Sequence, residues 1–423
     1  MHAPSRSPLP TRTQVAVAGG GTAGMALAVL LGRAGIRVCV LEKQPRPTAA
    51  PRGEILQPNG LAVLARMGLL DALTQLIHAH AEVRRYHFRR IGGGPLCSFD
   101  YRELDHPHPT TLVLLPEVLD QVLREAAAAL PTVQVVAGAR VTGLLREGNH
   151  GRVTEIRLRH AGTEHAIETL LVAGADGARS RVRRVLNLGG RVTAYPEGYL
   201  TGLLPHPGGF AGEGFYYLGR GEILGLFPVS PQQLYFFYLL TPERHRRLRE
   251  AGDIAWLGRR LREIHPPLAA ATESIRDWSG LRFFPCARVT TPRWHAPGAV
   301  LLGDAAHSVN PHVAQGRNLA LVDAEVLAQQ VLPDLLAGRP PATARLAAFE
   351  RGARPGAEQL QRLGDELVLF WNASHPLLTL LRDRSFRTFA RHPPLRNRVT
   401  ARIAGLDPSP VGPWERLRLA IGW

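Results

Sequence analysis

Lysine is almost missing from this chain of 423 residues: Lys43 is the only one, so nearly all of the 51 basic residues are arginines. Against 35 acidic residues, they give a formal net charge of +16. The arginines are scattered among acids, as in residues 243–250 (ERHRRLRE), and are not interleaved with aromatic residues, which make up only 6% of the chain. Surfaces that bind nucleic acids combine basic and aromatic side chains. We therefore expect no nucleic-acid partner.

Cysteine and long apolar runs are also scarce. Cys39, Cys97 and Cys286 are far apart and form no CxxC pair, which argues against a zinc site, a disulfide framework or a dithiol centre. We expect no bound metal. No apolar run reaches the roughly 18 residues that span a bilayer, and residues 1–13 lack the apolar core of a signal peptide. The sequence predicts a soluble, cytoplasmic protein and leaves peripheral contact with a membrane open.

Apolar residues make up 45% of the chain and charged residues 20%, which is typical of a globular protein of about two to three domains. The first regular pattern lies at residues 14–43. An apolar strand is predicted over 15–18, a helix over 22–34 and a second strand over 36–41, with Gly35 placed as the left-handed residue that ends the helix. This order indicates a β-α-β unit.

The turn between the first strand and the helix contains Gly19, Gly21 and Gly24 in a GxGxxG pattern. The first glycine permits the tight turn, the second lets the backbone approach a pyrophosphate, and the third lets the helix pack close to the strand. The free N–H groups at the helix start would face the phosphates. Glu42, 18 residues after Gly24, is placed to accept hydrogen bonds from ribose hydroxyls. The pattern predicts a dinucleotide site.

Two further turns carry a glycine and an acid. A strand over 170–173 ends at Asp176, and a strand over 299–302 is followed by Gly303 and Asp304. A helix is expected over 319–332, with Gly316 at its start. Between these turns, residues 191–290 concentrate tyrosine, phenylalanine and proline, which suggests a separate sheet with apolar walls.

The remaining elements are less regular. We expect a hairpin of strands over 83–90 and 96–101 that turns at residues 92–94, and a helix over 116–130. Strands are expected over 133–145 and 153–158, and helices over the last 80 or so residues.

Taken together, the three turns resemble those of the group A flavoprotein monooxygenases, the para-hydroxybenzoate hydroxylase-like superfamily that includes ubiquinone-biosynthesis hydroxylases. The matching motifs span about 300 residues in the family's order. The resemblance implies an α/β fold with a Rossmann-like FAD-binding domain, an inserted β-sheet substrate domain and C-terminal helices. The FAD-binding domain would comprise residues 14–80, 116–190 and 291–340, and the substrate domain residues 81–115 and 191–290; residues 341–423 would be the C-terminal helical region.

The resemblance also implies cofactor contacts. Glu42 would bind the adenosine ribose, Arg52 would lie near the flavin and its phosphates, and Pro311 would lie by the reactive edge of the flavin. The backbone of Val141 would meet adenine. The residues that the resemblance assigns to FAD are Gly19, Gly21, Thr22, Ala23, Gly24, Glu42, Lys43, Arg52, Val141, Asp176, Gly303, Asp304, Pro311, Ala314, Gln315, Gly316, Arg317 and Asn318.

Two positions depart from the family pattern. Many relatives read GxG where this chain has Ala314-Gln315-Gly316, although the backbone stays accessible. Relatives also often carry Arg or Gln at the head of the helix that begins here near Leu115-Pro116-Glu117, so we do not carry that side-chain contact with FAD over to this chain.

Several side chains have two interpretations. His307 could be catalytic, but a histidine that stabilises its turn is favoured. Asp176 is either a ligand contact or a plain turn former. The run of arginines over 179–184 is expected to be a solvated face, with attraction of NAD(P)H phosphates as the alternative. In the inserted sheet the pocket candidates, against a plain core role, are Tyr216, Tyr217, Phe227, Pro228, Tyr235 and Phe237. Of these we expect Tyr216, Phe227, Pro228 and Phe237 to line a substrate pocket.

The function implied by the resemblance is that of an FAD-dependent monooxygenase with NADH or NADPH as transient electron donor. It would hydroxylate or epoxidise an apolar aromatic, quinone-like, quinolone-like or polyketide-derived small molecule with O2, through a flavin hydroperoxide. Since the cofactor supplies the oxygen chemistry, we assign no catalytic side chain. The alternatives are a prenyl reductase or halogenase-like enzyme, and a catalytically silent FAD-binding module. The WxWxIP pattern of tryptophan halogenases and a lysine near the middle of the chain are both absent.

Overall fold

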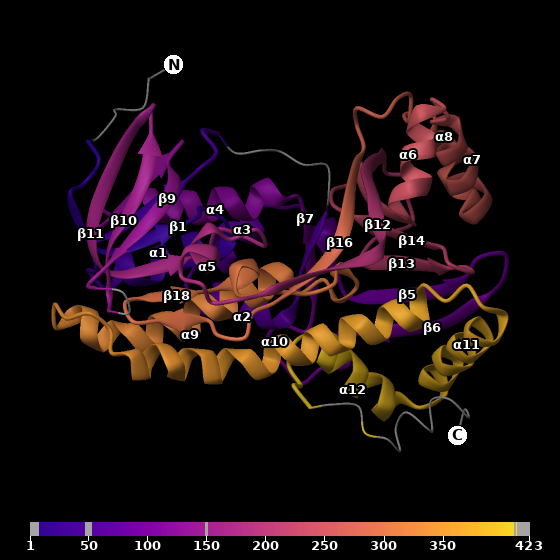
Figure 1. The fold of residues 1–423 in the computed structure, drawn as a ribbon. Helices are drawn as coiled ribbons and strands as arrows, with labels where there is room; N and C mark the ends of the chain where they lie inside the picture. The colour runs from indigo at the N-terminus through magenta and orange to yellow at the C-terminus, as the bar shows by residue number, and fades with distance from the viewer. Residues whose placement is uncertain (1–7, 47–52, 149–150, 410–411, 413–423) are drawn as a thin grey trace.

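A computed structural model describes residues 8–46, 53–148, 151–409 and 412 (Figure 1). Arg52, one of the predicted FAD residues, lies outside the described residues. Two eight-stranded sheets and one three-stranded sheet form the scaffold. The α/β fold predicted from the sequence is confirmed.

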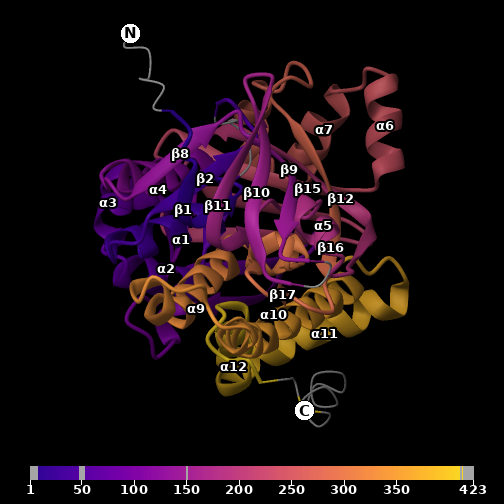
Figure 2. The same ribbon diagram turned by 60° about the vertical axis from the view of Figure 1, so that its left-hand side comes forward.

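The first sheet has the order β17-β18-β11-β1-β2-β8, with β10 and β9 attached to β11 as an antiparallel ribbon (Figure 2). The central pairs β18–β11, β11–β1, β1–β2 and β2–β8 are parallel. The strands are β1 (Arg12–Ala18), β2 (Val38–Glu42), β8 (Val133–Ala137), β9 (Arg140–Arg146), β10 (Val153–His160), β11 (Thr163–Gly174), β17 (His295–Ala296) and β18 (Ala299–Leu301). The carboxyl ends of these five parallel strands therefore meet at one edge, where α/β proteins bind ligands.

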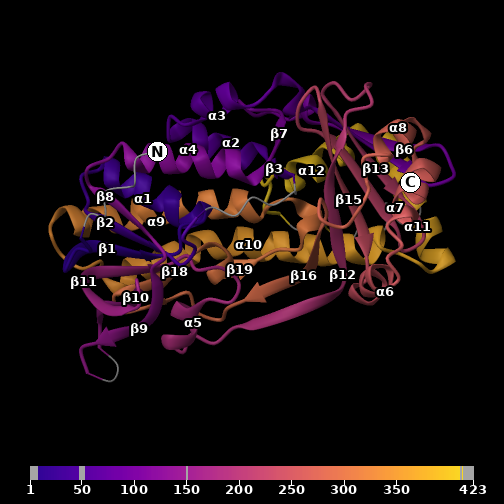
Figure 3. The ribbon, with the colours of Figure 1, turned by 90° about the horizontal axis from the view of Figure 1, so that it is seen from above.

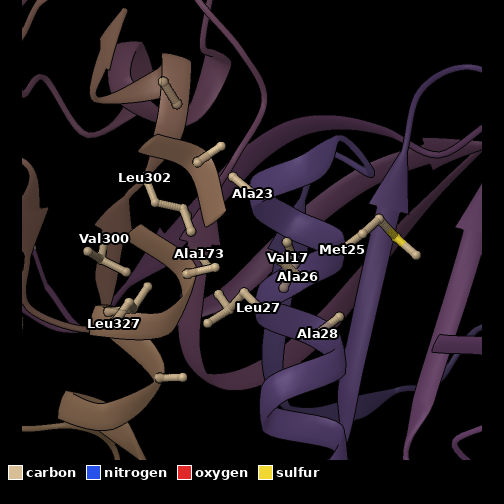
Figure 4. Close-up of a cluster of buried hydrophobic side chains, with 14 of the residues drawn as sticks. Val17, Ala23, Met25, Ala26, Leu27, Ala28, Ala173, Val300, Leu302 and Leu327 are labelled. Carbon is tan, nitrogen blue, oxygen red and sulfur yellow. The ribbon is translucent and has the colours of Figure 1, made fainter. Parts of the chain in front are cut away.

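Small side chains let the helices pack closely on this sheet. Helix α1 (Thr22–Arg33) packs against α9 (Gly316–Leu336) and α4 (Pro116–Ala128). Figure 4 shows the contact, in which every labelled side chain is at most 7% exposed. Its members are Val17, Ala23, Met25, Ala26, Leu27, Ala28, Ala173, Val300, Leu302 and Leu327. This core fixes the turns that follow β1, β11 and β18 relative to one another.

The second sheet has the order β19-β16-β12-β15-β14-β13-β5-β6, and all of its pairs are antiparallel except β13–β5. Its strands are β5 (Arg85–Arg90), β6 (Pro95–Asp100), β12 (Arg191–Pro205), β13 (Glu213–Leu218), β14 (Ile223–Pro228), β15 (Gln233–Leu240), β16 (Arg282–Thr290) and β19 (His307–Ser308). Figure 1 shows α6 (Pro242–Glu250), α7 (Ala255–Ile264) and α8 (Ala269–Thr272) above this sheet. The three helices interrupt the region that the sequence predicted only as sheet.

Below the second sheet lie the C-terminal helices α10 (Thr343–Trp371), α11 (Pro376–Arg391) and α12 (Pro393–Ile403). Figure 3 shows α10 extending from the parallel sheet to the antiparallel one. Asp365 of α10 accepts a hydrogen bond of 2.5 Å from Tyr195 in β12 and pairs with Arg288 in β16. These contacts tie the long helix to the second sheet.

A small third sheet has the order β3-β7-β4, and its strands come from residues 54–114. It contains β3 (Glu54–Leu56), β4 (Glu82–Val83) and β7 (Thr111–Leu114), and the helices α2 (Pro58–Arg66) and α3 (Leu70–Leu76) follow β3. Among the described residues, no helix has both the length and the hydropathy needed to cross a bilayer.

Most predicted elements are confirmed, with informative differences. Gly35 ends α1 at φ +83°, as expected. The single strand expected over 133–145 is two strands, because Gly138, at φ +74°, turns the chain between β8 and β9. Helix α9 begins at Gly316, as expected, and extends to Leu336, four residues beyond the predicted end.

Candidate active site

A cavity of about 600 Å³ lies at the carboxyl edge of the parallel sheet and extends to the second sheet. Its wall on the parallel-sheet side comes from the turns after β1, β11 and β18, from β3 and from the start of α9. The predicted FAD residues that line it are Gly21, Thr22, Ala23, Asp304, Pro311, Ala314, Gln315, Gly316 and Arg317. The structure thus brings together residues from both ends of the chain.

The turn after β1 leaves backbone donors open. Gly19 has φ +105°, and a Cβ there would lie 2.3 Å from the Ala175 carbonyl oxygen, so only glycine fits. Gly21 is the N-cap of α1 without a side-chain cap, and the first intrahelical bond comes from Met25. A Cβ on Gly21 would meet nothing within 4 Å. The N–H groups of the first turn of α1 are therefore available to an anion in the cavity.

Glu42 lies beside this turn at the end of β2. Its carboxylate accepts hydrogen bonds from the backbone N–H of Gly20 at 2.7 Å and of Gln44 at 2.8 Å. Glu42, Lys43 and Val141 do not line the cavity. Their predicted contacts with the adenosine half of FAD stay predictions.

The turn after β18 is held from behind by a buried ion pair. Asp323 Oδ2 accepts from Gly303 N and bonds to His307 Nε2, both at 2.7 Å. Burial alone would lower the pKa of His307, but the Asp323 carboxylate outweighs it and raises that pKa above its usual value. His307 also packs on Trp294, with ring centroids 4.7 Å apart. His307 therefore stabilises its turn, as the sequence interpretation favoured.

The start of α9 forms the second set of backbone donors. Ala314 is left-handed, at φ +50°, and Gln315 follows it in the right-handed region. This alternation points successive N–H groups to one side, an arrangement that binds anions. Gln315 provides no side-chain cap, because its amide bonds instead to Ile403 O at 2.7 Å and to Asn59 at 3.0 Å. The positive end of this 21-residue helix faces the cavity.

Two side chains brace this helix start. Asn318 accepts from Gln57 N at 2.9 Å and donates to Ile55 O at 3.1 Å, which holds β3 against α9. Arg317 forms ion pairs with Glu54 and with Asp120, the latter at 2.8 Å. Burial would lower the pKa of Arg317, but the two carboxylates raise it above its usual value.

The turn after β11 corrects one expectation. Arg183 is not solvated: it is 6% exposed and donates to Ala305 O and Ala178 O, both at 2.7 Å. Its guanidinium donates to carbonyl groups instead of water and so joins the turn after β11 to the turn after β18. Asp176 accepts from Arg181 N at 2.6 Å and from Val182 N at 3.1 Å, so it caps α5 (Arg181–Val185). The backbone at Ala175, Gly177 and Ala178 lines the cavity instead.

The opposite wall is formed by the second sheet. Of the predicted pocket residues, Tyr216, Phe227 and Phe237 line the cavity and Pro228 does not. Pro228 follows Phe227 at the end of β14, where successive side chains point to opposite faces of the sheet. Tyr235, also a candidate from the sequence, lines the cavity too, whereas the candidate Tyr217 does not. The sequence interpretation missed further wall residues: Tyr199, Thr201, Phe284, Pro285, Cys286 and Ala287.

A second cavity of about 30 Å³ adjoins the first and shares Ile55, Tyr216, His312 and Ala314 with it. Its other walls are largely aromatic: Tyr86, Phe88, Phe99, Tyr101 and Trp371. The Tyr101 hydroxyl donates to Gln57 at 2.9 Å, and that of Tyr86 bonds to Thr111 at 2.5 Å. Burial raises the pKa of both phenols, so they stay neutral.

These walls fit FAD. Two helix starts without side-chain caps, α1 and α9, face one cavity, and the open side of Gly21 leaves room for a phosphate. No side-chain cation is needed where backbone N–H groups and helix dipoles meet the anion. The described residues contain no cluster of His, Cys, Asp and Glu that could hold a metal ion.

Comparison with known proteins agrees with this geometry. The FAD binding domain family matches residues 12–363, and the chain belongs to this family, within the group A flavin monooxygenases. It is 32% identical to 6-methylpretetramide 4-monooxygenase of Streptomyces rimosus over 357 residues, which cover 83% of this chain and 82% of that protein. It is 28% identical to 3-demethoxyubiquinol 3-hydroxylase of Escherichia coli, covering 74% and 78%.

Solved structures give the same class. PqsL of Pseudomonas aeruginosa, in complex with 2-aminobenzoylacetate, superposes with a TM-score of 0.76 at 26% identity, covering 85% of this chain and 97% of that one. The p-nitrophenol 4-monooxygenase PnpA of Pseudomonas putida matches in fold, with a TM-score of 0.82 at 21% identity and coverage of 94% and 99%. The chain is an FAD-dependent monooxygenase.

Proposed function

We propose that this enzyme takes electrons from NADH or NADPH and inserts one atom of O2, as a hydroxyl group, into an apolar aromatic small molecule of the quinone, quinolone or polyketide type. The observation that carries the proposal is one cavity with two kinds of wall. Backbone donors at two helix starts form one side, and aromatic residues of the second sheet form the other.

The chain's residues bind, orient and shield, while bound FAD supplies the oxygen chemistry. The first turn of α1 would hold the phosphates, and the start of α9 would stabilise negative charge on the reduced ring. Arg317 and Asn318 keep α9 and β3 in register. The aromatic wall excludes water from the reacting centre.

The composition of the sheet wall supports an apolar substrate. The described residues of the second sheet that line the cavity include tyrosine, phenylalanine, threonine, proline, cysteine and alanine, and none is charged. A substrate carboxylate would have no guanidinium partner on this wall. The relatives that act on a pretetramide and a demethoxyubiquinol support a ring system of this kind.

The electron donor is the second part of the proposal. Since the sequence contains one dinucleotide fingerprint, nicotinamide would bind transiently at the cleft. Within the run over 179–184, for which attraction of NAD(P)H phosphates was the alternative, Arg183 is buried against carbonyl groups, whereas Arg179, Arg181 and Arg184 are exposed. Cytoplasmic location and peripheral contact with a membrane stay predictions.

Oxygen uptake tests the proposal. Purified, FAD-loaded protein is given NADH or NADPH and a panel of apolar phenols, quinones and quinolones. We expect one compound to accelerate oxygen consumption and to gain one oxygen atom by mass. Reduction of a compound without oxygen use would favour the prenyl-reductase alternative. Tight FAD binding with no turnover on either donor would favour the silent module, and both results would overturn the proposal.

A further inference from the structure

His312 lies on the wall that the two cavities share, directly after Pro311. The side chain is buried, with the residue 6% exposed. Its ring meets Tyr199 edge-on, with centroids 5.5 Å apart, and stacks on Trp371 at 5.5 Å. The ring is therefore held in one orientation between the second sheet and the end of α10.

One ring nitrogen of His312 has a partner and the other has none. Nε2 is 2.8 Å from Asn372 Oδ1, whereas Nδ1 is buried without a hydrogen-bond partner. Asn372 follows the last residue of α10 as its C-cap. A buried nitrogen without a partner costs free energy unless a ligand completes it. The spaces beside this ring are the two cavities.

The partner of Nε2 decides which ring nitrogen carries the proton. Asn372 presents its amide oxygen Oδ1 to Nε2, and an amide oxygen accepts hydrogen bonds but cannot donate them. His312 must then donate from Nε2, which leaves a lone pair on Nδ1.

The charge of His312 agrees with an acceptor role. Burial lowers its pKa to about 4, against a small opposing effect of the Asn372 hydrogen bond. At neutral pH the ring is uncharged, so it can accept a hydrogen bond through Nδ1 and cannot act there as a cation.

We propose that His312 Nδ1 accepts a hydrogen bond from a hydroxyl group of the aromatic substrate, and that His312 thereby selects phenols over rings of the same shape without a hydroxyl. The inference rests on the proposed function of the same cavity. Asn372 is the positioning residue that fixes the tautomer. The substrate ring would lie against the aromatic wall, with its hydroxyl directed to the junction of the two cavities.

Tyr199 provides the matched control. Its hydroxyl is also buried without a partner, and the residue lines the larger cavity in contact with His312. Tyr199→Phe removes one oxygen and keeps the ring. If the tyrosine hydroxyl selected phenols, this variant would lose the preference and the histidine variants would retain it.

The test is equilibrium binding of two probes, 1-naphthol and 1-methylnaphthalene, to FAD-loaded enzyme without electron donor. Dissociation constants come from the change in the absorbance spectrum of the bound flavin. We expect the native enzyme and Tyr199→Phe to prefer 1-naphthol by about tenfold, the effect of one hydrogen bond. His312→Leu should bring the ratio near one, and His312→Gln, which keeps an acceptor, should restore part of it.

Asn372→Leu tests the tautomer separately, since it frees Nε2 and should reduce the preference for 1-naphthol. Retention of the preference by His312→Leu, with stoichiometric FAD, would overturn the inference. So would a native enzyme that binds both probes equally or neither of them. Because no turnover is measured, a failure of the oxygen-uptake experiment is read independently of this result.

Discussion

At the scale of single residues, the glycines of the first turn have different steric roles. The Cβ of an alanine at position 21 would point into open space, whereas at position 24 it would lie 2.0 Å from Gly19 O. One glycine keeps room for a ligand, and the other keeps room for the chain itself. Substitutions at the two sites should therefore separate cofactor binding from folding.

We expect Gly21→Val to fold with nearly native stability and to bind FAD at least tenfold more weakly, because the added methyl groups fill the phosphate space. We expect Gly24→Ala to lower the free energy of unfolding by about 2–4 kcal/mol, since backbone must move. Denaturant unfolding of the FAD-free proteins and flavin fluorescence titration measure the two effects. Full FAD affinity in Gly21→Val would contradict the site.

The His307–Asp323 pair predicts a pH dependence of stability. The pKa of His307 is raised in the folded protein, so the pair's contribution is fully present below the unfolded pKa of about 6.5 and is lost as pH rises through the folded pKa. We expect His307→Gln to cost about 1–3 kcal/mol at pH 6 and clearly less at pH 9. Urea unfolding at both pH values measures this, and a cost independent of pH would speak against a charged pair.

At the scale of elements, the start of α9 depends on Arg317, which joins β3 and α4 to the helix. Removal of Arg317 leaves the carboxylates of Glu54 and Asp120, which are largely buried, without this cation. Such a change is far costlier than loss of an exposed pair. The chain contains a control on the same helix, since Arg66 of α2 pairs with Glu325 of α9 while its side chain is 58% exposed.

We expect Arg317→Leu to lower stability by about 3 kcal/mol and to weaken FAD binding, while Arg66→Ala changes stability by less than about 1 kcal/mol. Thermal unfolding with and without FAD compares the two variants. Equal effects of both substitutions would mean that the buried pair does not brace the helix.

Local sequence patterns predicted some of these elements accurately and missed others. Helix α1 and its glycine end were predicted nearly to the residue, because GxGxxG, apolar spacing and Gly35 all act within one short segment. The helices α6, α7 and α8 were missed, since the aromatic strands around them dominated the composition of the region. Pro228 was placed on the wrong side of its strand, because composition was used there without the two-residue alternation.

At the scale of the whole molecule, FAD would join segments more than 250 residues apart, from the turn after β1 to the start of α9. A ligand that binds only the folded state stabilises it by an amount set by its concentration relative to Kd, about 2.7 kcal/mol at one hundred times Kd. Binding of FAD at the two helix starts should therefore raise the free energy of unfolding of the whole protein.

We expect FAD to raise the Tm of the FAD-free protein by about 3 °C at one hundred times its Kd. FMN, which lacks the adenosine half and one phosphate, should give a smaller rise at the same concentration, since it leaves contacts at the first turn unmade. Differential scanning fluorimetry at matched concentrations decides this. Equal shifts would remove the turn after β1 from the cofactor site.

The sequence by itself determined the class of this protein, because the glycine turns and their flanking strands and helices are local and each has a mechanical reason. Only the tertiary structure decided which side chains face the cavity. Asp176 Oδ2 and the Asn318 amide bond to backbone groups, Arg183 is buried, and His312 acquires an acceptor nitrogen through Asn372. Those roles depend on partners brought together by packing, and no spacing along the chain specifies them.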